Sequence, residues 1–301
     1  MPNIDSNGVS LHYESFGDER NPAIVLIMGL AAQMILWPDA LCEMLAKAGF
    51  RVIRFDNRDA GLSTHLHHLG KPNIALQYVK FMVGGKINAP YKIDDMAADT
   101  AGLIGALNLG RVHIVGASMG GMIAQNLAAS VPAKMLSLTS IMSTTGRRSL
   151  PKSSWRATKV LLTPAAKHGD TEGAIKRMMN VFGVIASRTY PPTSEQMRDI
   201  CTRHVLRANS PDSGARQLLA IAASGDRTSI VRQIKVPTLV IHGDEDELIP
   251  YPAGLETARM VREGGGQATS LIIEGMGHDL PEILLPRLAE AIVSHCRAVS
   301  S

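Results

Sequence analysis

Short apolar runs alternate with longer amphipathic stretches along most of the chain. The apolar runs predict buried strands, and apolar residues spaced three and four positions apart predict helices. Strands are predicted at residues 9–16, 23–28, 50–55, 112–115, 135–141, 238–243 and 269–273, and helices at 38–48, 94–110 with Asp94 as N-cap, 122–129, 253–262 and 286–296. Several of the runs are apolar on both faces, as in parallel strands covered on both sides. The pattern therefore predicts an α/β fold with a mainly parallel sheet flanked by helices.

The alternation of strands and helices stops between Gly146 and Lys235. This segment has helical periodicity and contains Pro191-Pro192, but it has no run that clearly predicts a strand. We therefore expect residues 1–145 and 236–301 to form the core, with residues 146–235 inserted as a helical cap (lid). The segment carries a net charge of +10 while the rest of the chain carries −6. This excess favours a solvated basic surface, and attraction of an anionic substrate or acidic carrier is the alternative.

Composition limits the classes of protein that remain. A length of 301 residues with 45% apolar residues fits one large domain with an insertion, or two small domains. A net charge of +4 is too small to indicate nucleic acid, and no apolar run approaches the roughly 20 residues that span a membrane. Cys42, Cys201 and Cys296 are odd in number and widely spaced, which is typical of a reducing compartment. We expect a cytoplasmic protein without nucleic-acid or membrane partners, and its oligomeric state stays open.

Three histidines, His65, His67 and His68, lie close together in a less regular stretch. A metal site is conceivable there, but no carboxylate or cysteine completes a recognisable set of ligands. We therefore favour a surface loop and expect no metal.

The pentapeptide Gly116-Ala117-Ser118-Met119-Gly120 lies between the strand at 112–115 and the helix at 122–129. A sharp turn from strand to helix needs residues without bulk on both sides of the serine, and Gly116 and Gly120 meet that need. This is the nucleophile-elbow pattern, which holds a serine hydroxyl exposed above a parallel sheet. A glycine-rich turn without a ligand is the alternative for the pentapeptide taken alone.

A serine hydroxyl needs a base to remove its proton and an acid to orient that base. His278 follows the strand at 269–273, and Asp244 and Asp246 follow the strand at 238–243. Because the carboxyl ends of parallel strands meet at one edge of the sheet, these residues are expected to gather beside Ser118. The chain order Ser, Asp, His is the one that accompanies a nucleophile elbow.

Taken together, these motifs resemble the α/β-hydrolase superfamily, and within it the esterase-like branch, over nearly the whole chain. The branch includes bacterial carboxylesterases and methyl esterases of the aclacinomycin methylesterase type, which share a Met-Gly turn. The matching segments are Met28-Gly29-Leu30, residues 56–63, residues 116–120, residues 242–250 and Gly277-His278.

The resemblance implies a role for each site residue. It selects Asp246 as the acid of a triad with Ser118 and His278, and leaves Asp244 as a structural neighbour. It also implies an oxyanion hole made by the backbone N–H groups of Leu30 and Met119. The expected reaction is hydrolysis of a small to medium acyl or methyl ester through an acyl-enzyme, without a cofactor.

Other functions fit the same triad. A lactonase, a C–C bond hydrolase or a cofactor-free perhydrolase would use these residues on another substrate. A non-catalytic small-molecule receptor on the same fold is a further alternative, because fold does not determine function. Serine at residue 118 argues against haloalkane dehalogenases and epoxide hydrolases, whose elbows usually carry aspartate.

Overall fold

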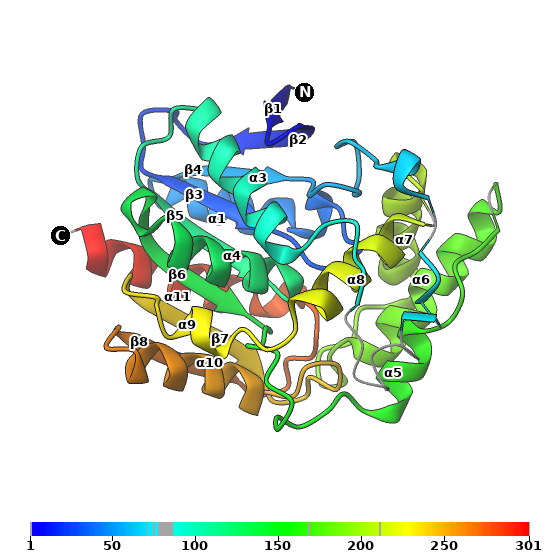
Figure 1. Cartoon of the computed structure of the whole chain (residues 1–301). Helices are drawn as coiled ribbons and strands as arrows, with labels where there is room; N and C mark the ends of the chain where they lie inside the picture. The colour runs from blue at the N-terminus through cyan, green and yellow to red at the C-terminus, as the bar shows by residue number, and fades with distance from the viewer. Residues whose placement is uncertain are drawn as a thin grey trace.

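Eight strands form one sheet in the order β1-β2-β4-β3-β5-β6-β7-β8, as the computed structural model shows (Figure 1). The structure describes all residues except 1, 71, 75, 78–86, 168, 211 and 301. The strands are β1 (Asn3–Ser6), β2 (Val9–Phe16), β3 (Ala23–Ile27), β4 (Arg51–Phe55), β5 (Val112–Ala117), β6 (Met135–Ile141), β7 (Thr238–Gly243) and β8 (Ala268–Ile273). The β1–β2 and β2–β4 pairs are antiparallel and all other pairs are parallel. The predicted α/β fold with a mainly parallel sheet is therefore confirmed.

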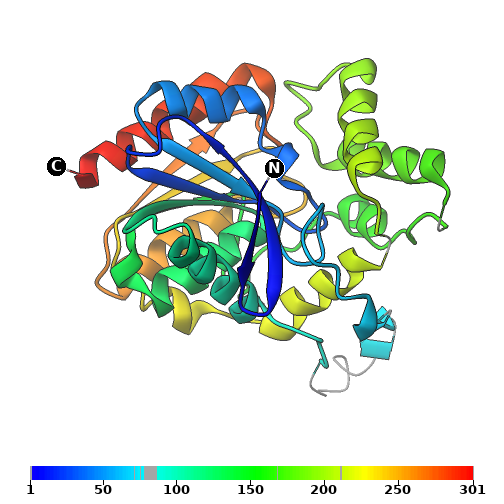
Figure 2. The same cartoon turned by 90° about the horizontal axis from the view of Figure 1, so that it is seen from above.

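Helices cover both faces of the sheet (Figure 2). On one face lie α1 (Asp39–Lys47) and α11 (Leu285–Ser300), which pack against the sheet through a cluster of buried leucine, isoleucine and valine side chains. On the other lie α3 (Ile93–Ala106), α4 (Met119–Ser130), α9 (Thr228–Val231) and α10 (Pro252–Glu263). Short 3-10 helices occur at Met34–Leu36, His67–Leu69, Pro132–Lys134 and Glu282–Leu284. All residues of β3, β5 and β7 are buried, as expected for central parallel strands.

Several local features differ from the sequence predictions. The strand β1 was not predicted, because Asn3–Ser6 contains a single apolar residue, Ile4, and no apolar run, and the strand forms by pairing with β2. Asp94 is not an N-cap, because α3 begins at Ile93 and its N-cap residue is Lys92. The Asp95 carboxylate accepts the Lys92 N–H instead, at 2.7 Å. The helix also ends at Ala106 rather than at residue 110.

Five helices and no strand occur in the described residues between β6 and β7. They are α5 (Trp155–Leu161), α6 (Thr171–Ile185), α7 (Ser194–Arg207), α8 (Ser213–Ser224) and α9. Helices α5 to α8 gather beyond the carboxyl ends of the parallel strands (Figures 1 and 2). Ile175, Cys201 and Val205 form a small core of their own between α6 and α7, whereas Ala220 and Val231 belong to the main core. The cap boundaries at 146 and 235 stay a prediction.

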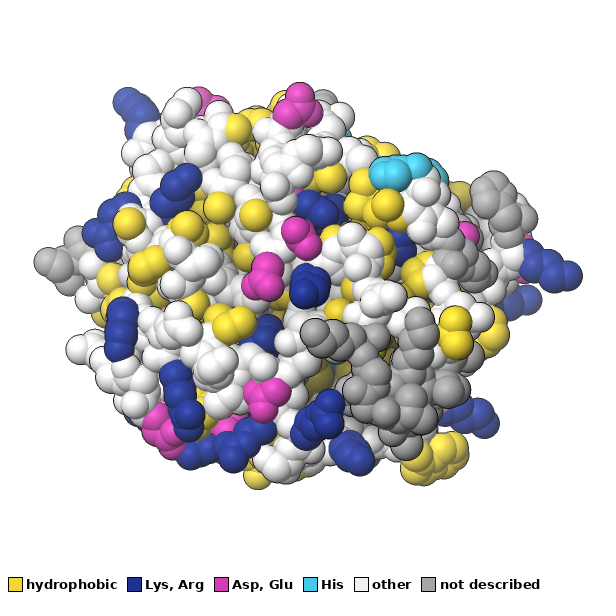
Figure 3. All heavy atoms as spheres, viewed as in Figure 1, with side chains coloured by type: hydrophobic (Ala, Val, Ile, Leu, Met, Phe, Trp, Pro, Cys, Tyr) yellow, Lys and Arg dark blue, Asp and Glu magenta, His cyan; other side chains and the backbone are white. Residues whose placement is uncertain are grey.

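The surface mixes charged, polar and single apolar side chains, with several Lys and Arg side chains along the lower edge of the face in Figure 3. Among the described helices, none combines the length and apolar character needed to cross a membrane. Within the described ranges, no three His, Cys, Asp or Glu side chains are grouped so that they could hold a metal ion. His65 donates from Nε2 to the Gly61 carbonyl instead (2.8 Å).

Candidate active site

The turn between β5 and α4 holds Ser118 in a rare backbone conformation. Its φ of 55° and ψ of −119° lie where an L-residue is strained, at a typical cost of about 1–3 kcal/mol. A Cβ on Gly116 would overlap the Gly120 carbonyl, and a Cβ on Gly120 would overlap the Ile27 carbonyl. The two glycines therefore let the helix start directly against β3 and β5, and this packing holds the strained serine in place.

His278 links Ser118 to Asp246 by two hydrogen bonds. Its Nδ1 lies 2.7 Å from Asp246 Oδ2 and its Nε2 lies 3.0 Å from Ser118 Oγ. An ionised carboxylate only accepts hydrogen bonds, so in the neutral imidazole the proton is on Nδ1 and the lone pair of Nε2 faces the serine hydroxyl. The three residues are thus oriented for transfer of a proton from Ser118 to His278.

Asp246 is only 4% exposed and accepts four hydrogen bonds. Besides His278, the donors are the backbone N–H groups of Leu248 (2.9 Å) and Ile249 (2.8 Å) and the His242 Nε2 (3.2 Å). Burial opposes ionisation of this carboxyl, but the charge of His278 and the hydrogen bonds from both histidines outweigh it and hold the pKa well below its usual range. Asp246 is therefore an anion throughout the neutral pH range.

His242 was not predicted as part of the site. It lies at 0% exposure in β7, and its Nε2 donates to both Asp246 and the Ile249 carbonyl (2.7 Å). Since a carbonyl oxygen cannot donate, the proton must be on Nε2. The sequence places His242 next to Gly243-Asp244 but gives no sign that its ring turns toward Asp246.

The two aspartates of the loop after β7 lie in different places. Asp246 contacts His278, whereas Asp244 accepts the backbone N–H of Gly275 at 2.7 Å and so joins the loops after β7 and β8. Spacing in the sequence left this choice open.

A further carboxyl, Asp279, follows His278 directly and lines the cavity that opens above Ser118. Burial raises its pKa to about 6, although the backbone N–H of Ser187 donates to it at 3.0 Å. Asp279 therefore changes charge close to neutral pH, unlike Asp246. Asp279 was not predicted as part of the site.

Leu30 lies in the turn after β3, next to the turn that carries Ser118. Ile27 and Gly116 are register partners, and a Cβ on Gly29 would lie 3.2 Å from Ser118 Cβ. Within the part of the chain that the structure describes, the N–H groups of Leu30 and Met119 donate no hydrogen bond to another residue. Two N–H donors at adjoining turns, one of them at the N-terminus of α4, suit a developing negative charge.

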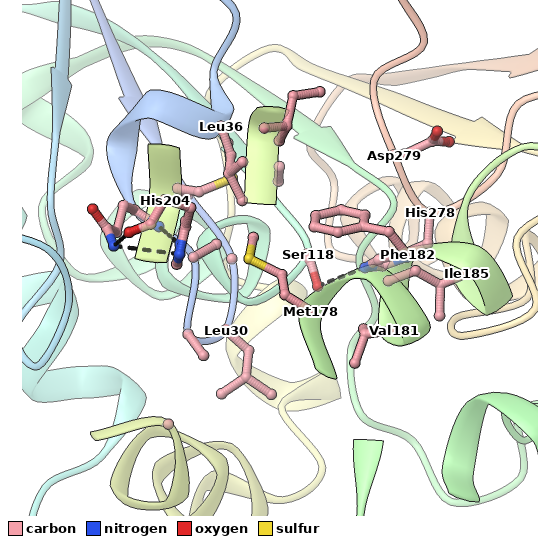
Figure 4. A pocket seen from close by; sticks show the side chains of 18 of the residues that line it. Leu30, Leu36, Ser118, Met178, Val181, Phe182, Ile185, His204, His278 and Asp279 are labelled. Atoms are coloured by element: carbon pink, nitrogen blue, oxygen red, sulfur yellow. Dashed lines mark hydrogen bonds between the residues drawn. The ribbon is translucent and has the colours of Figure 1, made fainter. Parts of the chain in front are cut away.

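A cavity of about 2160 Å³ opens above Ser118 and His278. Its wall is mainly apolar and includes residues of α6, α7 and α8, and Met178, Val181, Phe182 and Ile185 of α6 lie close to the two residues in Figure 4. Leu30 and Leu36 line the opposite side. Ligand pockets for drug-sized molecules usually measure about 300–1,000 Å³, so this cavity has room for a large apolar molecule.

The chain is similar in sequence to a known protein family and to individual enzymes. The family profile described as alpha/beta hydrolase fold matches residues 22–281. A rhodomycin D methylesterase from a Streptomyces species is 27% identical over 314 residues, covering 99% of this chain and 98% of that protein. A 3-oxoadipate enol-lactonase from Acinetobacter baylyi is 25% identical and covers 83% of this chain and 81% of its own length.

Solved structures show the same architecture. An esterase from Thermogutta terrifontis superposes with a TM-score of 0.73 at 21% identity and 100% coverage of both chains. An enol-lactonase from Burkholderia xenovorans gives a TM-score of 0.72 at 21% identity, with 98% of this chain and 100% of that chain covered. At 21% sequence identity these similarities show the fold alone.

Proposed function

Because the chain belongs to the α/β-hydrolase superfamily, in its methylesterase branch, we propose that it hydrolyses carboxylic esters with Ser118 as nucleophile. The supporting observation is the pair of hydrogen bonds that join Ser118 to His278 and His278 to Asp246 beneath an apolar cavity. His278 supplies the base and Asp246 the orienting anion that a serine hydroxyl needs at neutral pH.

In the first half of the reaction, Ser118 Oγ attacks the ester carbonyl carbon and its proton passes to His278 Nε2. Asp246 stabilises the imidazolium through Nδ1, at the 2.7 Å distance already present. The carbonyl oxygen becomes an oxyanion, which accepts hydrogen bonds from the backbone N–H groups of Leu30 and Met119. One such donor typically contributes about 3 kcal/mol to the stabilisation of the transition state.

In the second half, His278 gives its proton to the leaving alcohol, and the C–O bond to that alcohol breaks. A water molecule then enters, loses a proton to His278 and attacks the acyl carbon on Ser118. The acid leaves when the Ser118 oxygen takes the proton back. In this scheme His278 transfers each proton, Asp246 stabilises the imidazolium, and the two backbone N–H groups stabilise the oxyanion.

The cavity and the relatives together favour the methyl ester of a bulky apolar acid. Two relatives are methylesterases, and the cavity above Ser118 is larger than a small or medium acyl group requires. We therefore expect a higher kcat/KM for the methyl ester of a polycyclic aromatic acid than for methyl butyrate. Equal values, or a preference for methyl butyrate, would contradict this substrate class.

The test of the reaction compares p-nitrophenyl acetate, butyrate and octanoate hydrolysis by wild type, Ser118→Ala and Ser130→Ala. Ser130 lies at the exposed end of α4, so its substitution is a matched control on the same helix. We expect multiple turnovers by wild type and control, and a loss of about a thousandfold or more in Ser118→Ala. Labelling of Ser118 by a phosphonate without any ester turnover would instead indicate a receptor or a different substrate class.

Lactone hydrolysis is a second candidate, because an enol-lactonase is similar to this chain over 83% of its length. The same attack on a lactone would open the ring and leave the alcohol attached to the acyl-enzyme. A lactone turned over with a kcat/KM above that of every ester in the panel would favour this reaction.

A further inference from the structure

The turn that carries Leu30 contains a second strained residue. Ala31 has a φ of 54°, in the left-handed region that favours glycine. An alanine in this conformation costs about 1 kcal/mol or more, so contacts from elsewhere must hold the turn in place.

Gln217 of α8 provides one of these contacts. Its Oε1 accepts the Ala31 N–H at 2.7 Å, and its Nε2 donates to the Arg58 carbonyl at 2.8 Å. The side chain is 0% exposed, and a Cβ on Gly214, one turn earlier, would lie 3.1 Å from Ala31 Cβ. One amide of the inserted helices therefore joins the strained turn to the loop after β4.

A second amide holds the other end of the same turn. Asn57 Nδ2 donates to the Met28 carbonyl at 2.9 Å. The Leu30 N–H thus belongs to a short stretch of backbone whose two ends are held by Asn57 and Gln217. The two attachments fix the peptide planes on either side of the one that carries this N–H, whose own carbonyl, that of Gly29, accepts the Ala32 N–H at 3.4 Å, so the direction of the Leu30 N–H depends on both.

We propose that Gln217 is a positioning residue for the oxyanion hole, and that through it helix α8 sets the direction of the Leu30 N–H. This inference rests on the proposed function, in which that N–H stabilises the oxyanion. Gln217 does not line the cavity, so it acts on the reaction through the backbone that it holds, by accepting the Ala31 N–H.

The size of the expected effect follows from the geometry of such donors. Loss of an oxyanion donor reduces kcat by roughly 10²–10³-fold, and a displacement of about 1 Å can cost about 10²-fold. A displaced but still present N–H should give a reduction of about 10- to 100-fold in kcat. The KM should change little, because the ground-state carbonyl depends less on this donor than the oxyanion does.

The first experiment measures kcat and KM for Gln217→Met and for Ser224→Ala on an ester that the wild type hydrolyses. Methionine has a similar length but neither accepts from Ala31 nor donates to Arg58. Ser224 is the matched control, because it lies on the same helix and its Oγ also accepts a core backbone N–H, that of Ile93 (3.2 Å). We expect a reduced kcat in Gln217→Met alone, with wild-type kinetics in the control.

A second readout separates positioning from general loss of structure. A trifluoromethyl ketone is attacked at its carbonyl carbon by Ser118 Oγ, whose proton passes to His278. The oxygen of the resulting hemiketal carries a negative charge and lies in the oxyanion hole. The affinity of the ketone for Gln217→Met should fall by the same factor as kcat/KM, while the affinity for the product acid stays unchanged. If both affinities fall together, or neither falls, Gln217 has a merely structural role.

Should Gln217→Met fail to fold, Gln217→Asn gives the same test with a polar side chain one methylene shorter. Its amide cannot reach both partners, so we expect the same parallel fall in kcat and ketone affinity. A folded Gln217→Asn or Gln217→Met with wild-type kcat and ketone affinity would overturn the inference alone. Absence of any ester turnover by the wild type would instead contradict the proposed function.

Discussion

Two carboxyl groups beside His278 show how local surroundings determine charge. Asp246 accepts four hydrogen bonds, and its pKa is held well below the usual range. Asp279 is adjacent in sequence to His278, but burial dominates its surroundings and raises its pKa to about 6. At neutral pH the folded protein therefore carries one well-stabilised and one poorly stabilised carboxylate at the site.

Substitution of Asp279 by asparagine should stabilise the protein at neutral pH. Between about pH 4 and 6 the folded state keeps a proton on Asp279 that the unfolded state has lost, so the wild-type free energy of unfolding falls as pH rises through this window. Asparagine does not titrate, so it removes this pH-dependent loss of stability. Relative to wild type, Asp279→Asn should gain about 1–2 kcal/mol between pH 4.5 and pH 7.5 in urea unfolding. A difference independent of pH would contradict the assigned titration.

His242 gives a second prediction for a single residue. Phenylalanine at this position removes the Nε2 donor shared by Asp246 and the Ile249 carbonyl, so Asp246 should hold His278 less firmly. We expect kcat to fall about tenfold, in the range of a lost orienting hydrogen bond. His113→Phe is the control, since His113 is an equally buried histidine near the amino end of β5. Equal kcat in the two variants would assign His242 a role in stability only.

At the scale of elements, the site depends on how closely α4 approaches β3. A Cβ on Gly120 would overlap backbone atoms of Ile27 and Met28, which cannot move without separating the helix from the sheet. The elbow therefore lies where β3, β5 and α4 meet, and the position of Ser118 depends on all three elements.

Gly120→Ala should abolish activity and lower Tm, whereas Gly105→Ala should leave activity intact. Gly105 lies in α3, is exposed, and its added Cβ would meet only Lys134 Nζ at 3.5 Å. Alanine there should raise the free energy of unfolding by about 0.5–1 kcal/mol through helix propensity. Activity assays and thermal unfolding of both variants test the contrast, which fails if Gly120→Ala retains wild-type turnover.

The same elements explain what the sequence could predict. The strands and the turn at Ser118 produce strong local patterns of apolar runs and glycines, so the sheet and the order of its elements were predictable. The polar strand β1 forms only through pairing, and the start of α3 depends on Asp95 rather than Asp94. No local sequence pattern indicates the roles of Gln217 and His242. The partner of Gln217 lies far away in the sequence, and that of His242 lies across a turn.

At the scale of the whole molecule, two buried ion pairs attach the inserted helices to the loop after β4. Arg207 of α7 contacts Asp56 at 2.7 Å, and Arg216 of α8 contacts Asp59 at 2.6 Å. Both carboxylates are fully buried, so each depends on its arginine for compensation of charge. Helices α7 and α8 are thereby fixed to the same loop that supports the turn of Leu30.

Arg216→Met should lower the free energy of unfolding by about 3–5 kcal/mol, because Asp59 is left as a buried carboxylate without its arginine. Asp59→Asn in the same chain removes that charge and should restore part of the loss. Urea unfolding of the two single variants and the double variant measures the coupling. Additive losses would show that the pair contributes no interaction of its own.

The attachment of α7 and α8 divides the insertion into parts with different evolutionary freedom. These two helices are attached to the core by Gln217, Arg207 and Arg216. Substitutions at these residues should therefore also affect the reaction. Helices α6, α7 and α8 all line the cavity, but among the described residues no hydrogen bond or ion pair joins α6 to the loop after β4, and its Met178, Val181 and Phe182 lie beside Ser118 and His278. We therefore expect substitutions at these three α6 side chains to change which substrates fit while leaving the proposed reaction intact, and directed evolution of substrate range should begin there.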